Sequence, residues 1–362
     1  MNKKAIWIII VVLGIVVATY YVNSRGSNSN STRTIVAILP LTGLSATHGE
    51  YSKRGIEMAL ADLPSSRNII VVYEDSQMDP KAAISEFNKN LGQGDMTAVL
   101  SLGSPVAMAL KPLAVTSKTV LMSIVSAPTY SSPNDYTFRI NGTVDVEMES
   151  ILQTIKALGI KKLAVVFQND DYGRGLVNSL KQKFDGVLVA EEGFLPTATD
   201  MRSELTKVKS KSPDGVFVAA YAKVVGLVAK QSKELGMKTS LICGSACDNP
   251  DLLTAAGSSA DSLVIVAPSP KANSIFDQKY RATYKEAPNF VSIRMYDAVK
   301  LITGAIDACT KSTDFKVCMK DNIHAVKDFP GAAFPVNFDQ NGDLLDKFVT
   351  KKVVNGVLQI QE

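Results

Sequence analysis

The sequence predicts an α/β protein with two doubly wound parallel-sheet lobes joined by a hinge, preceded by an N-terminal hydrophobic helix. From Thr34 onward, apolar segments of strand length alternate with amphipathic segments of helix length, a pattern typical of parallel sheets covered on both faces. The alternation breaks at the segment DYTFRINGT and then starts again, which indicates two sheets. With 362 residues, of which 46% are hydrophobic, the chain can form a core in each lobe.

The first series contains four strands and three helices. Asp79 and Pro80 mark the start of its second helix, because Asp79 can cap that helix and Pro80 fits the first helical position. The strands are expected at TIVAILPL, NIIVVYED, TAVLSL and TVLMSIVS, and the helices at GEYSKRGIEMALADL, DPKAAISEFNKNL and PVAMALKPLAVTS.

The second series is longer and ends in elements of a different kind. Its strands are expected at KKLAVVFQND, GVLVAEEGF, DGVFVAA, TSLICG and DSLVIVAP, and its helices at VEMESILQTIKALG, YGRGLVNSLKQKF, DMRSELTKVKS and KVVGLVAKQSKELG. Two long helices, SIFDQKYRATYKEA and NFVSIRMYDAVKLITGAIDAC, follow. A final β segment contains Asn341 and Gly342, which are expected to form a hairpin turn.

These series predict a lobe 1 and a lobe 2 between which the chain crosses near Asn141, Pro268 and Pro335. Two lobes with a few chain crossings form a clam-shell hinge. Ligands in such folds bind outside the carboxyl ends of the strands, so a site is expected in the cleft. The predicted segments are 1–26 (signal anchor or signal peptide), 27–33 (linker), 34–140 with 269–335 (lobe 1) and 141–268 with 336–362 (lobe 2).

The N-terminal segment predicts export. Lys3 and Lys4 precede an apolar run over residues 5–22, close to the roughly 20 residues that a membrane-spanning helix needs. A retained membrane anchor and a signal peptide removed by cleavage both fit this pattern. In either case the positive flank stays in the cytoplasm, so we expect the rest of the chain to be extracytoplasmic, in the periplasm or at the cell surface.

The four cysteines agree with that compartment. Cys243 and Cys247 are four residues apart, and Cys309 and Cys318 are nine apart. An even number of cysteines in an exported protein predicts two local disulfides. Four unpaired thiols are the alternative.

Composition and motifs argue against several other functions. The net charge is +4, with 39 basic and 35 acidic residues, and no basic stripe interleaved with aromatics points to nucleic acid. Neither His48 nor His324 has a further ligand at metal-binding spacing, so we expect no metal and no cofactor. The sequence contains no Walker loop, G-x-S-x-G or H-E-x-x-H motif, so we expect no enzymatic activity.

A turn of Gly103, Ser104 and Pro105 joins a predicted strand to a predicted helix. Free N–H groups at a helix start carry partial positive charge, and a hydroxyl adds a donor, so the turn can bind a carboxylate. Gly103 permits close approach of the backbone, and Pro105 fits the first helical turn. The alternative is that Ser104 only caps the helix.

Several segments together resemble the type I periplasmic binding proteins, and most closely the leucine/isoleucine/valine-binding branch that serves ABC importers. They are IVAILPLTGLSATHGEYSKRGIEMALADL, VVYEDSQMDPKAAISEFNKNL, LGSPVAMALKPLA, FRINGTVDVEMES, FQNDDYGRGL, MYDAVKL and FDQNGD. The resemblance covers about Thr34 to the C-terminus. It implies an extracytoplasmic solute-binding protein that captures a small carboxylate-bearing ligand, such as a branched-chain or other amino acid or a related metabolite, in the cleft and delivers it to an ABC permease.

The resemblance also implies which residues bind the ligand. The turn at Gly103 and Ser104 corresponds to the family's site for the α-carboxylate, and Ser126 falls where a threonine is common. His48 falls where an aromatic side chain often closes over the ligand, with a surface-loop residue as the alternative. Tyr172 and Tyr221 fall where second-lobe tyrosines contact it, with packing in the core as the alternative. Tyr296 is a further candidate, for which core packing is the stronger interpretation.

One position departs from the family pattern. In amino-acid binders an acidic residue after the strand like TSLICG pairs with the ligand's ammonium, whereas Ser245 stands there in this chain. Asp248 either substitutes for it or caps the helix that begins near Pro250. A desolvated ammonium without a carboxylate is costly, so this departure favours a ligand with a carboxylate and no paired amine, and it argues for a small carboxylate or polar metabolite over an amino acid. A membrane-anchored sensor or accessory protein without a transport role is the alternative function.

Overall fold

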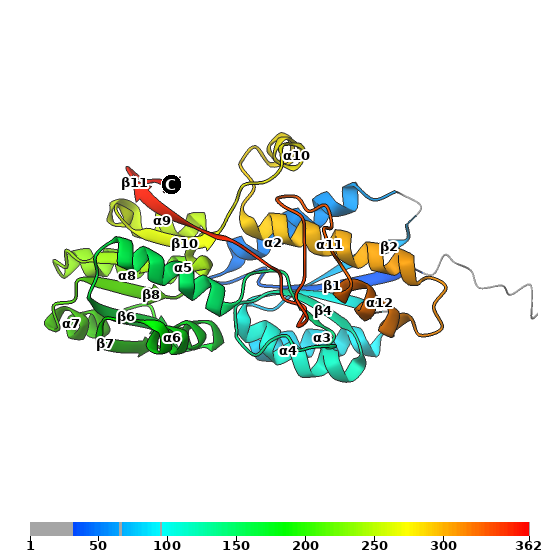
Figure 1. Cartoon of the computed structure of the whole chain (residues 1–362), viewed down its shortest axis with the longest axis horizontal. Helices are drawn as coiled ribbons and strands as arrows, with labels where there is room; N and C mark the ends of the chain where they lie inside the picture. Colours follow the sequence, from blue (N-terminus) through cyan, green and yellow to red (C-terminus); the bar gives the residue numbers. More distant parts are fainter. Residues whose placement is uncertain (1–31, 65–66, 95, 362) are drawn as a thin grey trace, which may run out of the picture.

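The computed structural model describes residues 32–64, 67–94 and 96–361. Two α/β lobes lie side by side along the long axis of the molecule (Figure 1). The predicted apolar segment at residues 5–22 lies outside the described residues. Among the helices that are described, none is both long and apolar enough to span a bilayer.

Lobe 1 is built on a five-stranded parallel sheet in the order β2-β1-β3-β4-β5. Alternate residues of the interior strand β1 enter two different cores: Ile35 and Leu39 pack on one face of the sheet, and Val36 and Ile38 on the other. This two-sided burial confirms the doubly wound prediction. The strands are β1 (Arg33–Leu39), β2 (Ile69–Asp75), β3 (Met96–Leu102), β4 (Val120–Ile124) and β5 (Thr137–Arg139).

Helices cover both faces of this sheet. α2 (Ala46–Ala61), α11 (Phe290–Cys309) and α12 (Phe315–His324) pack on one face, and α3 (Pro80–Gly92) and α4 (Ser104–Ser117) on the other. The predicted start of α3 is correct, because the Asp79 carboxylate accepts the N–H groups of Lys81 and Ala82. α12 and the three-residue strand β5 were not predicted.

Lobe 2 is built on a seven-stranded sheet in the order β12-β11-β10-β9-β8-β6-β7. The strands β6 to β10 are parallel, and β11 and β12 add an antiparallel pair at the edge. They are β6 (Lys162–Gln168), β7 (Val187–Phe194), β8 (Gly215–Ala219), β9 (Ser240–Cys243), β10 (Val264–Pro268), β11 (Phe348–Val354) and β12 (Val357–Ile360).

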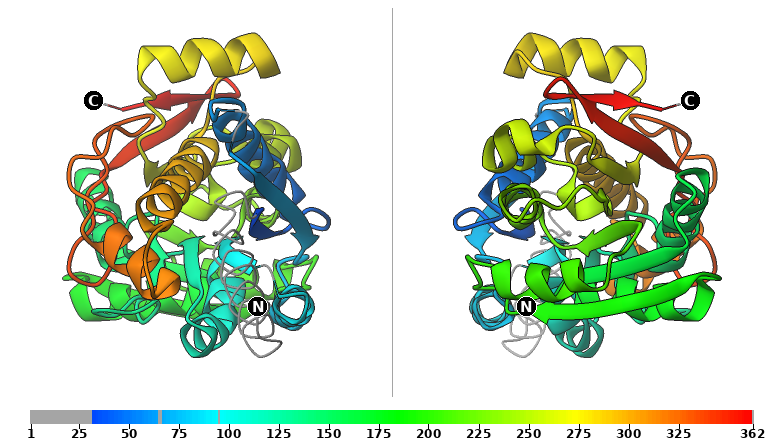
Figure 2. Two further views of the ribbon diagram at one scale, coloured as in Figure 1. Left: turned by 90° about the vertical axis from the view of Figure 1, so that its right-hand side faces the viewer. Right: turned by 90° about the vertical axis from the view of Figure 1, so that its left-hand side faces the viewer.

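The helices of lobe 2 also lie on both faces. α5 (Val144–Ala157) and α6 (Asp171–Lys183) share one core, and α7 (Arg202–Ser210), α8 (Ala222–Glu234) and α9 (Pro250–Ala256) share the other. Short helical turns η1 (Ser245–Cys247) and η2 (Gly257–Ala260) flank α9. α10 (Ser274–Tyr284) lies at the periphery, apart from both sheets (Figure 2).

The C-terminal segment differs from the prediction in two ways. Val336, Phe338 and Leu344 belong to the core of lobe 1, so the third crossing lies at residues 345–347 rather than near Pro335. Asn341 and Gly342 do form a tight turn, closed by the bridge between Phe338 and Leu344. The hairpin of β11 and β12, however, turns at Asn355 and Gly356, which both have positive φ, as a two-residue hairpin turn of this kind requires.

Both predicted disulfides are formed. Cys243–Cys247 links the end of β9 to η1 in lobe 2. Cys309–Cys318 links α11 to α12 in lobe 1. Each bond therefore joins two neighbouring elements of a single lobe.

Candidate ligand-binding site

A cavity of about 40 Å³ lies between the lobes, several times the roughly 10–15 Å³ that a single water needs. Loops at the carboxyl ends of the strands line it, as expected for open α/β sheets. Both lobes contribute to the lining, which consists of His48, Leu102, Gly103, Ser104, Ile124, Val125, Ser126, Asn141, Tyr172, Tyr221, Ser245, Ala246, Phe290 and Val291.

The lobe 1 wall begins at the turn between β3 and α4. Gly103 is the N-cap residue of α4, and its φ of 96° favours glycine. Ser104 is the first helical residue and makes no capping hydrogen bond; its hydroxyl oxygen instead accepts the backbone N–H of Ser126 at 3.4 Å. Ser104 therefore is not a simple helix cap, and the first N–H groups of α4 have no acceptor within the helix.

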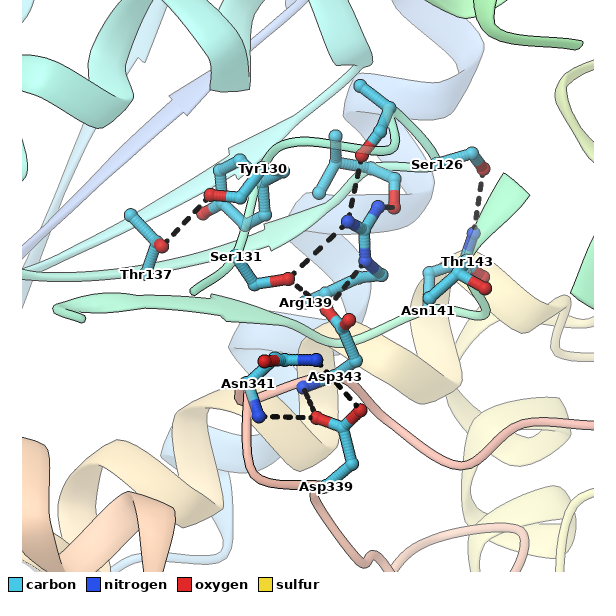
Figure 3. Close-up of polar contacts among 12 residues, drawn as sticks. Ser126, Tyr130, Ser131, Thr137, Arg139, Asn141, Thr143, Asp339, Asn341 and Asp343 are labelled. Carbon is cyan, nitrogen blue, oxygen red and sulfur yellow. Dashed lines mark hydrogen bonds and ion pairs between the residues drawn. The ribbon is translucent and has the colours of Figure 1, made fainter. Parts of the chain in front are cut away.

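The turn after β4 forms the next part of this wall, and Arg139 holds it in place. The guanidinium of Arg139, which is fully buried, donates to the carbonyl oxygens of Val125 and Ala127, both at 2.8 Å. It also pairs with Asp343 at 2.8 Å (Figure 3). Because the two carbonyls flank Ser126, Arg139 fixes the backbone on both sides of that residue.

Asn141 lies at the first crossing and links this turn to lobe 2. Its side-chain amide donates to the hydroxyl of Ser126 at 3.4 Å (Figure 3). The carbonyl of Ser126 accepts the N–H of Val144, the first residue of α5. The Oδ1 atom of Asn141 is buried and has no hydrogen-bond partner among the described residues. The hinge therefore presents a free acceptor at the cavity.

His48 of α2 connects the two lobes directly. Its Nδ1 atom lies 3.1 Å from the side-chain nitrogen of Asn249, the N-cap of α9. Its ring also meets the edge of Tyr221, with 6.5 Å between ring centres. Burial lowers the pKa of His48 to about 4, so the imidazole is neutral at pH 7 and Nδ1 accepts from Asn249.

Two tyrosines line the cavity on the lobe 2 side, and the buried carboxylate of Glu147 lies behind the lining. The rings of Tyr172 and Tyr221 lie 5.6 Å apart. The Tyr172 hydroxyl donates to Oε1 of Glu147 at 3.0 Å, and the N–H of Ser245 donates to the same oxygen at 2.6 Å. Ala246 in turn donates its N–H to the Tyr172 hydroxyl at 3.2 Å. Glu147 thus ties α5, α6 and η1 together.

The family model for periplasmic binding proteins matches residues 32–348, which is most of the chain. The chain belongs to the periplasmic binding protein family. Its fold matches a leucine-binding protein from Thermotoga maritima with a TM-score of 0.86 at 22% identity, over 91% of this chain and 98% of that one. It also matches an isoleucine-bound branched-chain amino acid binding protein from Streptococcus pneumoniae, with a TM-score of 0.81 at 22% identity, over 91% and 99%.

Curated relatives in this family have similar lengths. The chain is 26% identical over 333 residues to the Leu/Ile/Val-binding protein BraC3 of Rhizobium johnstonii, covering 86% of this chain and 88% of that protein. It is 21% identical over 329 residues to the Leu/Ile/Val-binding protein of Escherichia coli, covering 86% and 87%. The predicted place in the Leu/Ile/Val-binding branch of this family is confirmed, and these relatives are binding proteins, not enzymes.

Seven of the nine ligand-site residues proposed from the sequence line the cavity of this periplasmic binding protein: Gly103, Ser104, Ser126, His48, Tyr172, Tyr221 and Ser245. Asp248 does not, because its carboxylate pairs with Lys351 at 2.5 Å. Tyr296 does not either, because its hydroxyl donates to Asp62 at 2.7 Å and its ring packs on Phe276. Asp248 therefore does not fill the acidic position that Ser245 leaves vacant.

Three residues that shape this site were not predicted from the sequence. Asn141 was expected only as a crossing point, and Arg139 carries no local signal because its partner Asp343 is 204 residues away. Glu147 did carry a signal: it falls three residues after Val144 and four before Ile151, on the apolar face of α5. A charged residue on a buried helix face is rare unless it has a specific partner.

Proposed function

We propose that this protein captures a small carboxylate-bearing solute, of the amino-acid class, in the cleft between its lobes and delivers it to an ABC permease. The observation that carries the proposal is the turn at the start of α4, where Gly103 and the hydroxyl-bearing Ser104 line the cavity. Such a helix N-terminus favours an anion. The Leu/Ile/Val-binding relatives support the amino-acid class.

The lining divides into a polar part and an apolar part. Ser104, Ser126 and Asn141 provide the polar groups, while Leu102, Ile124, Phe290 and Val291 provide an apolar surface. A ligand with one carboxylate end and a short apolar side chain matches that division.

The test is a panel of amino acids, 2-hydroxy acids and unsubstituted carboxylates, measured by thermal shift and then by calorimetry on the exported form. A ligand that binds the folded protein must raise its Tm in a concentration-dependent way. We expect at least one carboxylate to do so. The proposal fails if amides or sugars raise the Tm and no carboxylate does.

The transport role needs a separate measurement. Uptake of the ligand identified above, in cells with and without the gene, distinguishes import from sensing. Unchanged uptake together with tight binding would favour the sensor or accessory role over transport.

A further inference from the structure

The carboxylate of Glu147 is buried without a cation, directly behind Tyr172 and Ser245 of the cavity lining and not in the lining itself. Its side chain has 0% exposure, and among the described residues it takes part in no ion pair. One oxygen, Oε1, accepts from Tyr172 and Ser245, both cavity-lining residues. The other, Oε2, is buried and has no hydrogen-bond partner in the described part of the chain. Unpaired buried carboxylates are costly, so this arrangement calls for an explanation.

Two unpartnered atoms at the junction of α5 and the first crossing share a chemical character, whereas Nε2 of His48, which also has no partner among the described residues, is a donor and belongs to lobe 1. Oε2 of Glu147 and Oδ1 of Asn141 are both acceptors, and both lie where α5 meets the first crossing. The opposite side of the cavity, at the start of α4, presents donors. The site is therefore polarised: its donors suit a carboxylate and its unpartnered acceptors suit a group with several N–H bonds.

The energetics of Glu147 agree with that polarity. Burial raises the pKa of its carboxyl, and polar groups of Ser245, Tyr172 and Ser126 oppose the shift. The carboxylate lies in the first turn of α5, where the helix dipole favours negative charge. A cation brought in by a ligand would supply the partner that the protein itself lacks.

We propose that Glu147 recognises an ammonium group of the ligand and so takes the place of the acidic residue that Ser245 leaves vacant. Ser126 belongs to lobe 1, and Ser245 and Glu147 belong to lobe 2, so opening of the lobes separates the groups in front of the carboxylate. Rotation about the terminal torsion of glutamate is broad, which lets Oε2 turn toward the cavity. This inference rests on the proposed function: the proposed function places the ligand's carboxylate at the start of α4, and the inference places the ammonium of the same ligand at Glu147.

The test uses pairs of probes that differ only at the amine: L-alanine with L-lactate, and L-leucine with L-2-hydroxy-4-methylpentanoate. Calorimetry on the wild type should show tighter binding of the amino acid in at least one pair by about tenfold or more, the size of a charge-assisted hydrogen bond. If the hydroxy acid of each pair binds as tightly as the amino acid, or if no amino acid binds at all, the inference is overturned.

Glu147→Gln sharpens the test, because it keeps an acceptor for Tyr172 and Ser245 and removes the charge. We expect it to weaken amino-acid binding by about 10- to 100-fold and to leave hydroxy-acid binding within about threefold. Glu149→Gln is the matched control, since Glu149 is an exposed residue of the same helix, 3.8 Å from Lys183. Equal losses for both kinds of ligand in E147Q would assign Glu147 a structural role.

The result also separates this inference from the proposed function. If Ser104→Ala weakens all probes and E147Q weakens none, carboxylate binding at the cleft stands and the ammonium role of Glu147 falls. If no carboxylate of either kind binds the wild type, the proposed function falls with it. The paired probes on the wild type distinguish these outcomes even if E147Q does not fold.

Discussion

The two walls of the cleft are held in place by different means. On lobe 1, Arg139 fixes the backbone around Ser126. Its guanidinium donates charge-assisted hydrogen bonds to the carbonyl oxygens of Val125 and Ala127, and it forms an ion pair with Asp343. On lobe 2, the turn at Ser245 is fixed by the Cys243–Cys247 disulfide and by the carboxylate of Glu147. The lobe 1 wall therefore depends on the buried ion pair of Arg139 and Asp343. The lobe 2 wall depends on a disulfide and on the carboxylate of Glu147, which has no cationic partner among the described residues.

This difference means that each wall can be disturbed separately. The largest expected effect is that of Arg139→Leu, which leaves the buried carboxylate of Asp343 without its cation and removes the guanidinium donors of two backbone carbonyls. We expect a loss of about 3–5 kcal/mol in the free energy of unfolding, measured by denaturant titration. The control is Arg281→Leu, whose exposed pair with Asp277 should be worth less than about 1 kcal/mol. Similar losses in the two variants would contradict the role given to Arg139.

The next effect compares the two disulfides. Replacing Cys243 and Cys247 by alanine, or Cys309 and Cys318 by alanine, should each cost about 2–3 kcal/mol of stability, because both bonds close short loops. Only the first pair lies beside Ser245, so only its loss should also weaken ligand binding. Denaturant titration and calorimetry on both double variants check this, and an equal change in affinity would show that the lobe 2 turn does not depend on its disulfide.

Ser104→Ala should affect binding more than folding. The hydroxyl makes no capping bond, and its contact with the N–H of Ser126 is long, at 3.4 Å. Loss of a donor to a bound carboxylate costs about 1.5–3 kcal/mol, or roughly ten- to a hundredfold in Kd. Gly103 is unsuitable as a second probe, because a side chain there would collide with the sulfur of Met78. A lowered Tm with unchanged affinity would return Ser104 to a structural role.

The smallest expected effect is the pH dependence of stability that comes from His48. This residue of lobe 1 forms a hydrogen bond with Asn249 of lobe 2. The folded pKa of about 4 is below the ordinary 6.5, so the unfolded chain takes up a proton that the folded protein does not. The contribution of His48 to stability is therefore complete above pH 6.5 and decreases as the pH falls toward 4, by about 2 kcal/mol at pH 5.

Unfolding measured at pH 7.5 and pH 5 checks this contribution. The difference in the free energy of unfolding between the wild type and His48→Gln should change by about 2 kcal/mol between the two pH values. His324→Gln serves as the control, because His324 is the other histidine of the chain. A constant difference between wild type and H48Q at both pH values would show that the histidine titrates in the same way in the folded and the unfolded protein.

The sequence predicted the fold more fully than the site. Alternating apolar strands and amphipathic helices are strong signals, and they located nearly every long element. β5 has three residues, too few for a periodic pattern. The third crossing was placed too early because Pro335 looked like a boundary, whereas the contacts of Val336 and Phe338 with the core of lobe 1 depend on the tertiary structure.

Within the site, local chemistry was predictable and distant contacts were not. The Ser104 turn is visible in three consecutive residues. The pairing of Arg139 with Asp343 joins residues far apart in the chain, and nothing in either local segment reveals it. Glu147 could have been found, because a glutamate interrupts an otherwise apolar helix face. The family pattern places an acidic residue only after β9, so the resemblance gives no indication of a role for Glu147.

The three crossings of the chain also set the order in which the molecule can be completed during synthesis. Residues 144–268 form an uninterrupted run that contains five strands and five α-helices of lobe 2, so most of that lobe can assemble while the remainder of the chain is still emerging. Lobe 1 has to wait, because α11 packs against α2 and its core includes Leu344. Its first strands therefore remain exposed until α11 and Leu344 have been synthesised, and such long-range contacts slow folding. During that interval the half-built first sheet exposes apolar surface and unpaired strand edges, which makes it prone to aggregation.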